Sequence, residues 1–323
     1  MRKDKRNNKR NNCEPQGVYR VRNWSEYNAG LIARGSVTMW TNESALTMAN
    51  EAEPVMRGRP HVYSDALIQA LLTLKQVYHL TLRATQGFAQ SLRELAFAEL
   101  PAPNYTTLSR RAQDLRVALP VTSSGEPLHL VVDSTGVKLY GEGEWKVRKH
   151  GYSKRRTWRK VHLGLDVKTG QVRAALMTHQ DVDDASVLPG LLGQIPVDEP
   201  IETIGGDGAY DAKHCHAAIA VRGATSSIPP REGAQPWPER TPGASWRNEA
   251  IRDIARDGRR EWKKRSGYHR RSLVENTMYR FKILTGNRLW SRRIGSQATE
   301  MAIRVGVVNR MAALARPQSI RIA

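Results

Sequence analysis

Apolar residues recur at helical spacing through the first third of the chain and change to strand-like runs near its middle. Ser64 suits a helix N-terminus, and the apolar residues after it follow a helical period as far as Val77. A second helix is predicted over residues 81–97, and after the Pro-rich break at 101–104 a third begins at Tyr105. The first part of the chain is therefore predicted to be helical.

The third predicted helix carries hydroxyl and basic side chains at its start, followed by Arg110 and Arg111. Helix–turn–helix proteins reach base edges and phosphates with such a helix. Three-helix bundles that never contact DNA show the same pattern. We predict a helical, helix–turn–helix-like domain over residues 21–120, with Arg110 and Arg111 as candidate DNA contacts, and leave the bundle as the alternative.

Beyond the linker at 120–127, the spacing indicates an α/β domain. The apolar run 128–132 ends at Asp133, as in a buried central strand. The other expected elements are strands at 161–167 and 172–177, a helix through 187–192, a strand at 201–206, a helix at 214–221 and a strand at 225–228. This order predicts a mixed sheet with helices on its faces, and it suits an RNase H-like fold over residues 121–323.

More chain lies between Asp207 and Glu275 than one helix and one strand require. Residues 229–264, a Pro-rich excursion followed by a basic helix, are therefore predicted to be an insertion in the sheet domain. Trp237 and Trp246 within it either stack on a displaced base or fill a small core, and we favour the core. A final helix over 296–314 is expected to close the main core.

The helix predicted from Tyr268 onwards has two different sides. At about 100° per residue, one side gathers Tyr268, Arg271, Glu275 and Lys282. The opposite side gathers Leu273, Thr277, Phe281 and Leu284. A Glu among cations is commonly a surface ion pair. Together with Asp133 and Asp207 at strand ends, however, Glu275 completes three acids that can hold a pair of hard divalent cations.

The overall charge indicates a polyanionic partner. Among 323 residues, 51 are Lys or Arg and 31 are Asp or Glu, which gives a formal charge of +20. No apolar run of about 18 residues is present, so nucleic acid is favoured over a membrane. Residues 1–20 are predicted to be a basic, disordered arm that lies along phosphates or only aids solubility. The basic start, and only two cysteines, Cys13 and Cys215, suggest a cytoplasmic protein.

Other chemistries lack their motifs. The sequence contains no phosphate-binding Gly-rich loop and no Gly-x-Ser-x-Gly, so a metal-activated water or hydroxyl is the expected nucleophile. His214, Cys215 and His216 have no second pair of zinc ligands. The neighbouring acids Asp181, Asp183 and Asp184 are expected to cap the following helix.

Residues 138–160 interleave cations with aromatic residues directly after Asp133. Cations bind phosphates and aromatic rings stack on unpaired bases, which makes Arg148, Lys149 and Lys160 candidate DNA contacts. A solvated, charged hairpin is the alternative.

These motifs resemble a known family. The DDE transposases of bacterial insertion sequences share a pattern in which Tyr is followed by two residues and Arg, then by three residues and Glu, then by six residues and Lys. This chain reproduces the pattern with Tyr268, Arg271, Glu275 and Lys282. Asp133 in Val-Val-Asp-Ser-Thr-Gly and Asp207 in Gly-Asp-Gly-Ala-Tyr-Asp resemble the first two acids of that family. The segment from Tyr19 to Trp40 is similar to the insertion sequence 5 family in particular. The likeness extends to about Leu314.

The resemblance implies a transposase in which Asp133, Asp207 and Glu275 bind two Mg²⁺ or Mn²⁺ ions. Such an enzyme cuts DNA at terminal inverted repeats and joins the 3′-hydroxyls to target DNA. By the same resemblance, Arg271 and Lys282 hold phosphates and Tyr268 positions the backbone. A homodimer is expected, since two element ends must meet. The rival hypotheses are a nuclease of the same fold that does not join strands, and a non-catalytic DNA-binding protein.

Overall fold

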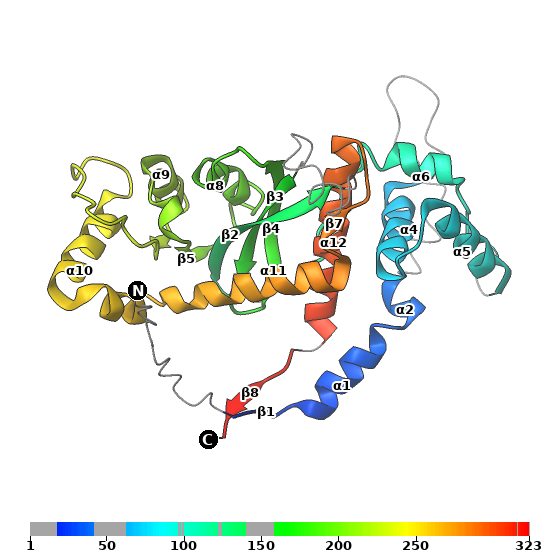
Figure 1. Cartoon of the computed structure of the whole chain (residues 1–323), viewed down its shortest axis with the longest axis horizontal. Coiled ribbons are helices and arrows are strands. Elements are labelled where there is room, and N and C mark those ends of the chain that lie inside the picture. The colour runs from blue at the N-terminus through cyan, green and yellow to red at the C-terminus, as the bar shows by residue number, and fades with distance from the viewer. Residues whose placement is uncertain are drawn as a thin grey trace, which may run out of the picture.

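The computed structural model shows a mixed α/β protein (Figure 1). It describes residues 18–41, 63–95, 98, 100–121, 125–139, 158–314 and 316–322. Arg148, Lys149 and most of the expected N-terminal arm lie outside these residues. Within the described chain, no helix is long and apolar enough to cross a membrane.

Six strands form the main sheet around a long central strand, β2 (Leu128–Leu139). The other strands are β3 (Trp158–Asp166), β4 (Val172–His179), β5 (Ile201–Gly205), β6 (Thr225–Ser226) and β7 (Arg288–Leu289). Their order is β4-β3-β2-β5-β6, and β7 pairs with the end of β2. β3 is antiparallel to β2 and β4, whereas β5 runs parallel to β2 and to β6. The sheet is consistent with the predicted RNase H-like domain.

The prediction that the central strand ends at Asp133 was wrong. β2 continues to Leu139, with Val137 fully buried. The polar residues Ser134 and Thr135, followed by Gly136, hid the continuing alternation of the strand. Asp133 therefore lies inside β2 and not at the end of the strand.

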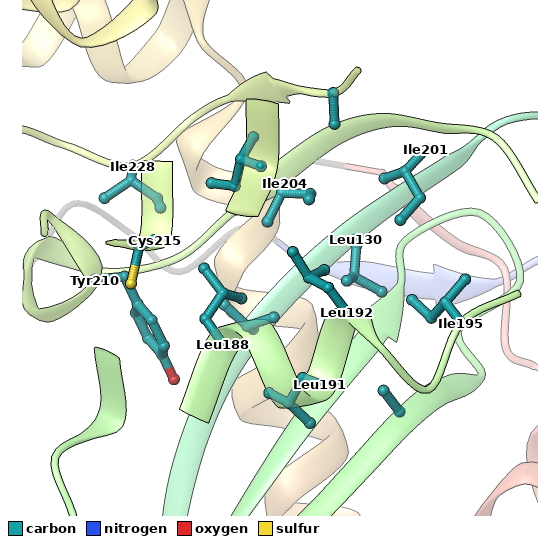
Figure 2. Packing of buried hydrophobic residues seen from close by; sticks show 14 of the residues in the cluster. Leu130, Leu188, Leu191, Leu192, Ile195, Ile201, Ile204, Tyr210, Cys215 and Ile228 are labelled. Atoms are coloured by element: carbon teal, nitrogen blue, oxygen red, sulfur yellow. The ribbon is translucent and has the colours of Figure 1, made fainter. Parts of the chain in front are cut away.

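Alternation along β2 assigns its side chains to two faces. Leu128, Leu130 and Val132 pack on one face against α8 (Asp184–Leu192) and α9 (Lys213–Val221), in the cluster of Figure 2. Val131 and Val137 pack on the other face, with α11 (Ser272–Thr285) and α12 (Ile294–Leu314). Since successive residues alternate, Asp133 belongs to the α11 face and Ser134 to the α8 face.

A separate core lies among the N-terminal helices. These are α4 (Asp65–Val77), α5 (Leu82–Leu95) and α6 (Tyr105–Arg111), in the predicted order. Ser64 caps α4 as expected, since its Oγ accepts a hydrogen bond from the Leu67 N–H at 3.2 Å. Ile303, Val307 and Met311 of α12 complete this core, so α12 joins the helical part to the sheet. A helix–turn–helix role for these helices stays a prediction.

The two ends of the described chain meet in a small ribbon. β1 (Tyr19–Val21) pairs antiparallel with β8 (Ser319–Arg321), beside α1 (Trp24–Ala33) (Figure 1). A short helix, α2 (Val37–Trp40), follows α1. None of these elements was assigned from the sequence.

The predicted insertion contains α10 (Ala244–Arg265), which breaks at Gly258, where φ is 84°. The next helix was predicted to begin at Tyr268 as an α-helix. Its first turn, η3 (Tyr268–Arg271), is instead a 3₁₀ turn that follows Gly267 at φ 68°, and α11 begins at Ser272. The 3₁₀ turn shifts Tyr268 relative to the α-helical spacing assumed for it.

Candidate active site

Asp133 lies partly buried on the face of the sheet that α11 covers. Its Oδ1 accepts a hydrogen bond from the Ser134 N–H at 2.8 Å. Burial raises the pKa of Asp133, and the nearby Asp207 and Glu275 carboxylates raise it further, while the Ser134 N–H and Arg271 act against the rise. Two acids that are distant in the sequence therefore act electrostatically on Asp133.

The parallel pairing of β2 and β5 places Asp207 near Asp133. Val131 pairs with Gly205, and each aspartate follows two positions later. Gly206 permits this approach, because a Cβ there would lie 2.9 Å from Cδ2 of Tyr210 and 3.2 Å from Cγ2 of Val132. Asp207 then caps the short helix η2 (Gly208–Tyr210) by accepting from the Ala209 N–H at 2.8 Å.

Arg271 lies between Asp133 and Glu275 and contacts both. Its Nη2 lies 2.5 Å from Oε1 of Glu275 and 3.6 Å from Oδ2 of Asp133. Glu275 is 53% exposed and stands on the open side of the site. Arg271 and Glu275 thus contact each other as the helical spacing predicted, and Arg271 also contacts Asp133 of the sheet.

The carboxylates of Asp133, Asp207 and Glu275 are of the chemical type that binds a divalent cation, but they are not spaced closely enough to hold one in this structure. Three carboxylates are the hard oxygen ligands that Mg²⁺ and Mn²⁺ prefer. Among the described residues, however, no three His, Cys, Asp or Glu side chains lie close enough together to hold a metal ion. The Arg271 guanidinium stands between Asp133 and Glu275 and supplies the positive charge there.

A second polar group lies behind Asp133, on the α8 face. Ser134 Oγ is 2.9 Å from Oδ2 of Asp184, and the Lys160 ammonium donates to Oδ1 of Asp184 at 3.0 Å and to the Val182 carbonyl at 2.8 Å. The Asp-rich turn was expected to cap α8, but Asp183 at the N-cap makes no side-chain capping bond. Asp184 instead binds Ser134 and Lys160. This role could not be predicted from the sequence, where Asp184 is only an acid in the first turn of a helix.

Tyr210 was also missed. Its ring packs in the cluster of Figure 2 and is 1% exposed. Its hydroxyl is buried and has no hydrogen-bond partner among the described residues. Burial raises the pKa of Tyr210, and the carboxylates of Asp184, Asp133 and Asp207 raise it further. The hydroxyl therefore lies near the acids without being fixed by them.

Tyr210→Phe is expected to change the free energy of unfolding by no more than about 1 kcal/mol, since it removes a buried hydroxyl that lacks a partner. Tyr210→Ala, which also removes the ring, is expected to cost about 3–5 kcal/mol. Urea unfolding of both variants measures the difference. A loss above about 2 kcal/mol in the Phe variant would mean that the hydroxyl is bonded in the folded protein.

The remaining predicted DNA contacts are dispersed. Lys282 lies partly buried on α11, and Arg110 is exposed on α6. Tyr268 contacts Trp262, with ring centroids 6.4 Å apart, and the Lys263 ammonium lies 4.8 Å from its centroid. Arg111 is held internally, since it donates to the Tyr63 carbonyl at 2.7 Å and pairs with Asp65. Lys160 is likewise held by Asp184.

In the His214–Cys215–His216 segment, His214 is exposed and the other two side chains are buried. Cys215 is buried, its Sγ donates to the Ala185 carbonyl at 3.1 Å, and burial raises the pKa of its thiol to about 12. His216 is buried beside Asp211, 3.2 Å from its Oδ1. Cys215 Sγ and His216 Nε2 both face protein partners.

Asp211 links the insertion to the active-site strand. It accepts hydrogen bonds from Arg247 Nε at 2.6 Å and from the Arg231 N–H at 2.9 Å. Trp237 packs on the Arg247 guanidinium, 3.9 Å from the ring centroid, and its ring meets His216 edge-on. Trp237 is therefore partly buried against Arg247 and His216, and its core role stays a prediction. Asp211 stands four positions after Asp207, so the insertion is attached close to the candidate site.

Comparison with known families identifies the domain. A family model described as a transposase DDE domain matches residues 124–310, and a second model with the same description matches residues 32–142. The first match spans β2, β5 and α11, the three elements that carry Asp133, Asp207 and Glu275.

Proposed function

Because the chain belongs to the family of transposases with a DDE domain, which cleave DNA and transfer its strands, we propose that it is the transposase of an insertion sequence. We assign it to the insertion sequence 5 family, on the likeness of residues 19–40. It binds the terminal inverted repeats, cleaves there, and joins the 3′-hydroxyl ends to target DNA. The observation that carries the proposal is the parallel register that sets Asp133 beside Asp207 on the face covered by the helix of Glu275.

In this proposal Asp133, Asp207 and Glu275 hold two Mg²⁺ or Mn²⁺ ions. When bound, the ions activate the attacking hydroxyl and stabilise the leaving oxygen of the phosphodiester. Arg271 must first leave Glu275 and Asp133, which it now contacts. A DNA phosphate is the natural new partner for its guanidinium, because guanidinium binds phosphate with two parallel hydrogen bonds. Binding of a DNA phosphate by Arg271 would then leave Glu275 and Asp133 free to serve, with Asp207, as ligands of a divalent cation.

The other proposed DNA contacts surround this site. Lys282 and Tyr268 position the cut strand, Arg110 contacts DNA from α6, and Arg148 and Lys149 act from the segment after β2. Lys160 and Arg111 contact DNA only after they release Asp184 and Asp65. A homodimer brings two element ends together.

A strand-transfer gel tests the function. Labelled duplexes that carry the element's ends are incubated with Mg²⁺ and an unlabelled target plasmid. The transposase is expected to yield 3′-ends covalently joined to the plasmid. Cleavage without joined products would indicate a nuclease, and binding without cleavage would indicate a DNA-binding protein; either result contradicts the proposal.

Arg271→Ala is expected to weaken DNA binding to unrelated sequences alike, and to reduce the salt slope by about 0.9. The reason is that Arg271 would contact phosphates, which carry no sequence. Arg110→Ala on the exposed part of α6 is expected mainly to alter sequence preference. Fluorescence anisotropy on matched and scrambled duplexes, at several salt concentrations, measures both. If Arg271→Ala instead altered sequence preference and Arg110→Ala weakened binding to all sequences alike, the roles proposed for these two arginines would be wrong.

A further inference from the structure

A cavity of about 540 Å³ lies between the N-terminal helices and α12. Its apolar wall includes Leu72 of α4, Leu82 of α5 and Ile303 of α12, and α6 adds Ser109. Small-molecule sites in proteins have volumes of about 300–1,000 Å³, mostly apolar walls and a few polar groups. The cavity therefore has the size and the lining of a ligand site.

One wall of the cavity is formed by residues 290–293, which follow β7 and are bound by α12. The Glu300 carboxylate accepts hydrogen bonds from the Trp290 N–H at 3.0 Å and from the Ser291 N–H at 2.8 Å. Gln297 donates from Nε2 to the Ser291 carbonyl at 3.2 Å. Because α12 binds both donors and acceptors of this backbone, the fold itself fixes the wall.

The same segment also contacts the helical part of the protein. Arg293 donates from Nη1 to Oε1 of Gln113, which follows α6, at 2.8 Å. Gly295, at the start of α12, lies so close to this part that a Cβ there would collide with the Gln113 carbonyl. Both sides of the cavity are therefore held in place by contacts of the fold.

The cavity carries positive charge that its own acid does not balance. Lys75, Arg292 and Arg293 line it, and Glu300 is the only acid among the described residues of the lining. Glu300 already pairs with Arg304, which lies outside the lining. The partly buried Lys75 ammonium has no hydrogen bond or ion pair with any described residue. Burial lowers the pKa of Lys75, Glu300 acts against this shift and Arg304 adds to it. A bound anion would supply the missing partner.

We propose that this cavity binds a nucleotide: the cations bind its phosphate, and the apolar wall and the Trp290 ring bind its base. Lys and Arg side chains neutralise phosphates, and bases stack on aromatic rings. Trp290 lines the cavity and is 54% exposed, which places its indole where the cavity reaches the surface. The ligand is either a free nucleotide or the unpaired last nucleotide of a DNA strand, since both have this chemistry.

The cavity is separate from the catalytic acids, none of which lines it. β7, which precedes its wall, pairs with β2 at Lys138, five residues and roughly 17 Å beyond Asp133 along the strand. A nucleotide bound in the cavity thus lies outside the bond that would be cut. The inference rests on the proposed function only in taking a nucleotide as the anion.

The test compares the full-length parent protein with Lys75→Met, which keeps the length of the side chain and removes its charge. Lys264→Met is the control, because it removes the same charge from an ammonium that Glu261 already binds at 2.8 Å. Fluorescence anisotropy without divalent cations measures the affinity for a blunt duplex and for the same duplex with one unpaired 3′-nucleotide. The parent and Lys264→Met are expected to bind the extended duplex about five- to tenfold more tightly, and Lys75→Met to bind both duplexes equally.

Urea unfolding gives a second readout. dAMP is expected to raise the unfolding midpoint of the parent and of Lys264→Met, but not that of Lys75→Met. Without dAMP, Lys75→Met is expected to unfold at the same or a higher urea concentration than the parent, because it removes a partly buried charge that has no partner among the described residues. A loss of binding in this variant is then not a loss of folding.

The two readouts distinguish the sources of the nucleotide. Stabilisation by dAMP together with preference for the extended duplex assigns the cavity to a DNA end, and stabilisation by dAMP alone assigns it to a free nucleotide. The inference is overturned if neither effect occurs, if inorganic phosphate stabilises the parent as much as dAMP does, or if Lys264→Met loses as much as Lys75→Met. A protein that shows these effects but never cuts DNA would contradict the proposed function and leave the cavity assigned.

Discussion

Asp133→Asn is expected to reduce DNA cleavage by at least about a thousandfold, the loss of roughly 4 kcal/mol of transition-state stabilisation. The amide keeps the shape of the side chain but removes the charge that would hold a divalent cation beside Asp207. The variant should fold normally, because the oxygen that accepts from the Ser134 N–H is retained. Nicking of a labelled inverted-repeat duplex in Mg²⁺ measures the effect.

The same substitution is expected to leave DNA binding unchanged or stronger. It removes a negative charge near the phosphates, and it removes one of the two carboxylates that hold Arg271. Asp198→Asn, at an exposed acid between α8 and β5, serves as the control and should alter neither cleavage nor binding. Cleavage above a tenth of the wild-type rate in the Asp133 variant would exclude this aspartate as a metal ligand.

Much of the site could be predicted because the patterns that indicate it involve residues close together in the sequence. The apolar run before Asp133 predicts the strand that carries it, and the spacing of four between Arg271 and Glu275 sets their contact. A strand before Asp207 and a helix around Glu275 follow from the same periodicities. These patterns also gave the mixed sheet and most of its helices.

The rest depends on contacts between distant segments. β7 and the β1–β8 ribbon are two or three residues long, too short for any alternation, and they exist only because a partner strand lies beside them. Asp184 is in a helical turn that resembles a cap, and only the fold brings it to Ser134 and Lys160. The contact of Arg271 with Asp133 likewise crosses from a 3₁₀ turn to the sheet. Spacing along the chain contains no signal for such pairs.

The motif Gly-Asp-Gly-Ala-Tyr-Asp illustrates both cases. Asp207 could be selected because it follows a strand. Asp211, at the end of the same motif, received no role from the sequence, since its partners lie on another helix and in the insertion. The structure buries it, 1% exposed, against Arg247, which is 5% exposed. A buried charged pair of this kind is costly to break from one side.

Asp211→Ala is accordingly expected to lower the free energy of unfolding by about 3–5 kcal/mol. The variant leaves the Arg247 guanidinium buried without its carboxylate, and it removes the acceptor of the Arg231 N–H and of His216. Urea unfolding at pH 7 measures the loss. Glu261→Ala is the control, because it removes an acid from an exposed pair with Lys264 on α10 and should cost less than about 1 kcal/mol.

The pH dependence of this loss follows from the ionisation of Asp211. Burial alone would raise the pKa of Asp211, but hydrogen bonds from His216, Arg247 and the Arg231 N–H together hold it well below its ordinary value. A carboxyl with a lowered pKa in the folded state contributes stability above its unfolded pKa, about 3.9, and loses it as the pH falls towards the folded value. The gap between wild type and Asp211→Ala should therefore be constant near neutrality and narrow below about pH 4. A gap that widens in acid would show that Asp211 is protonated in the folded protein, and the proposed attachment of the insertion through its charge would be wrong.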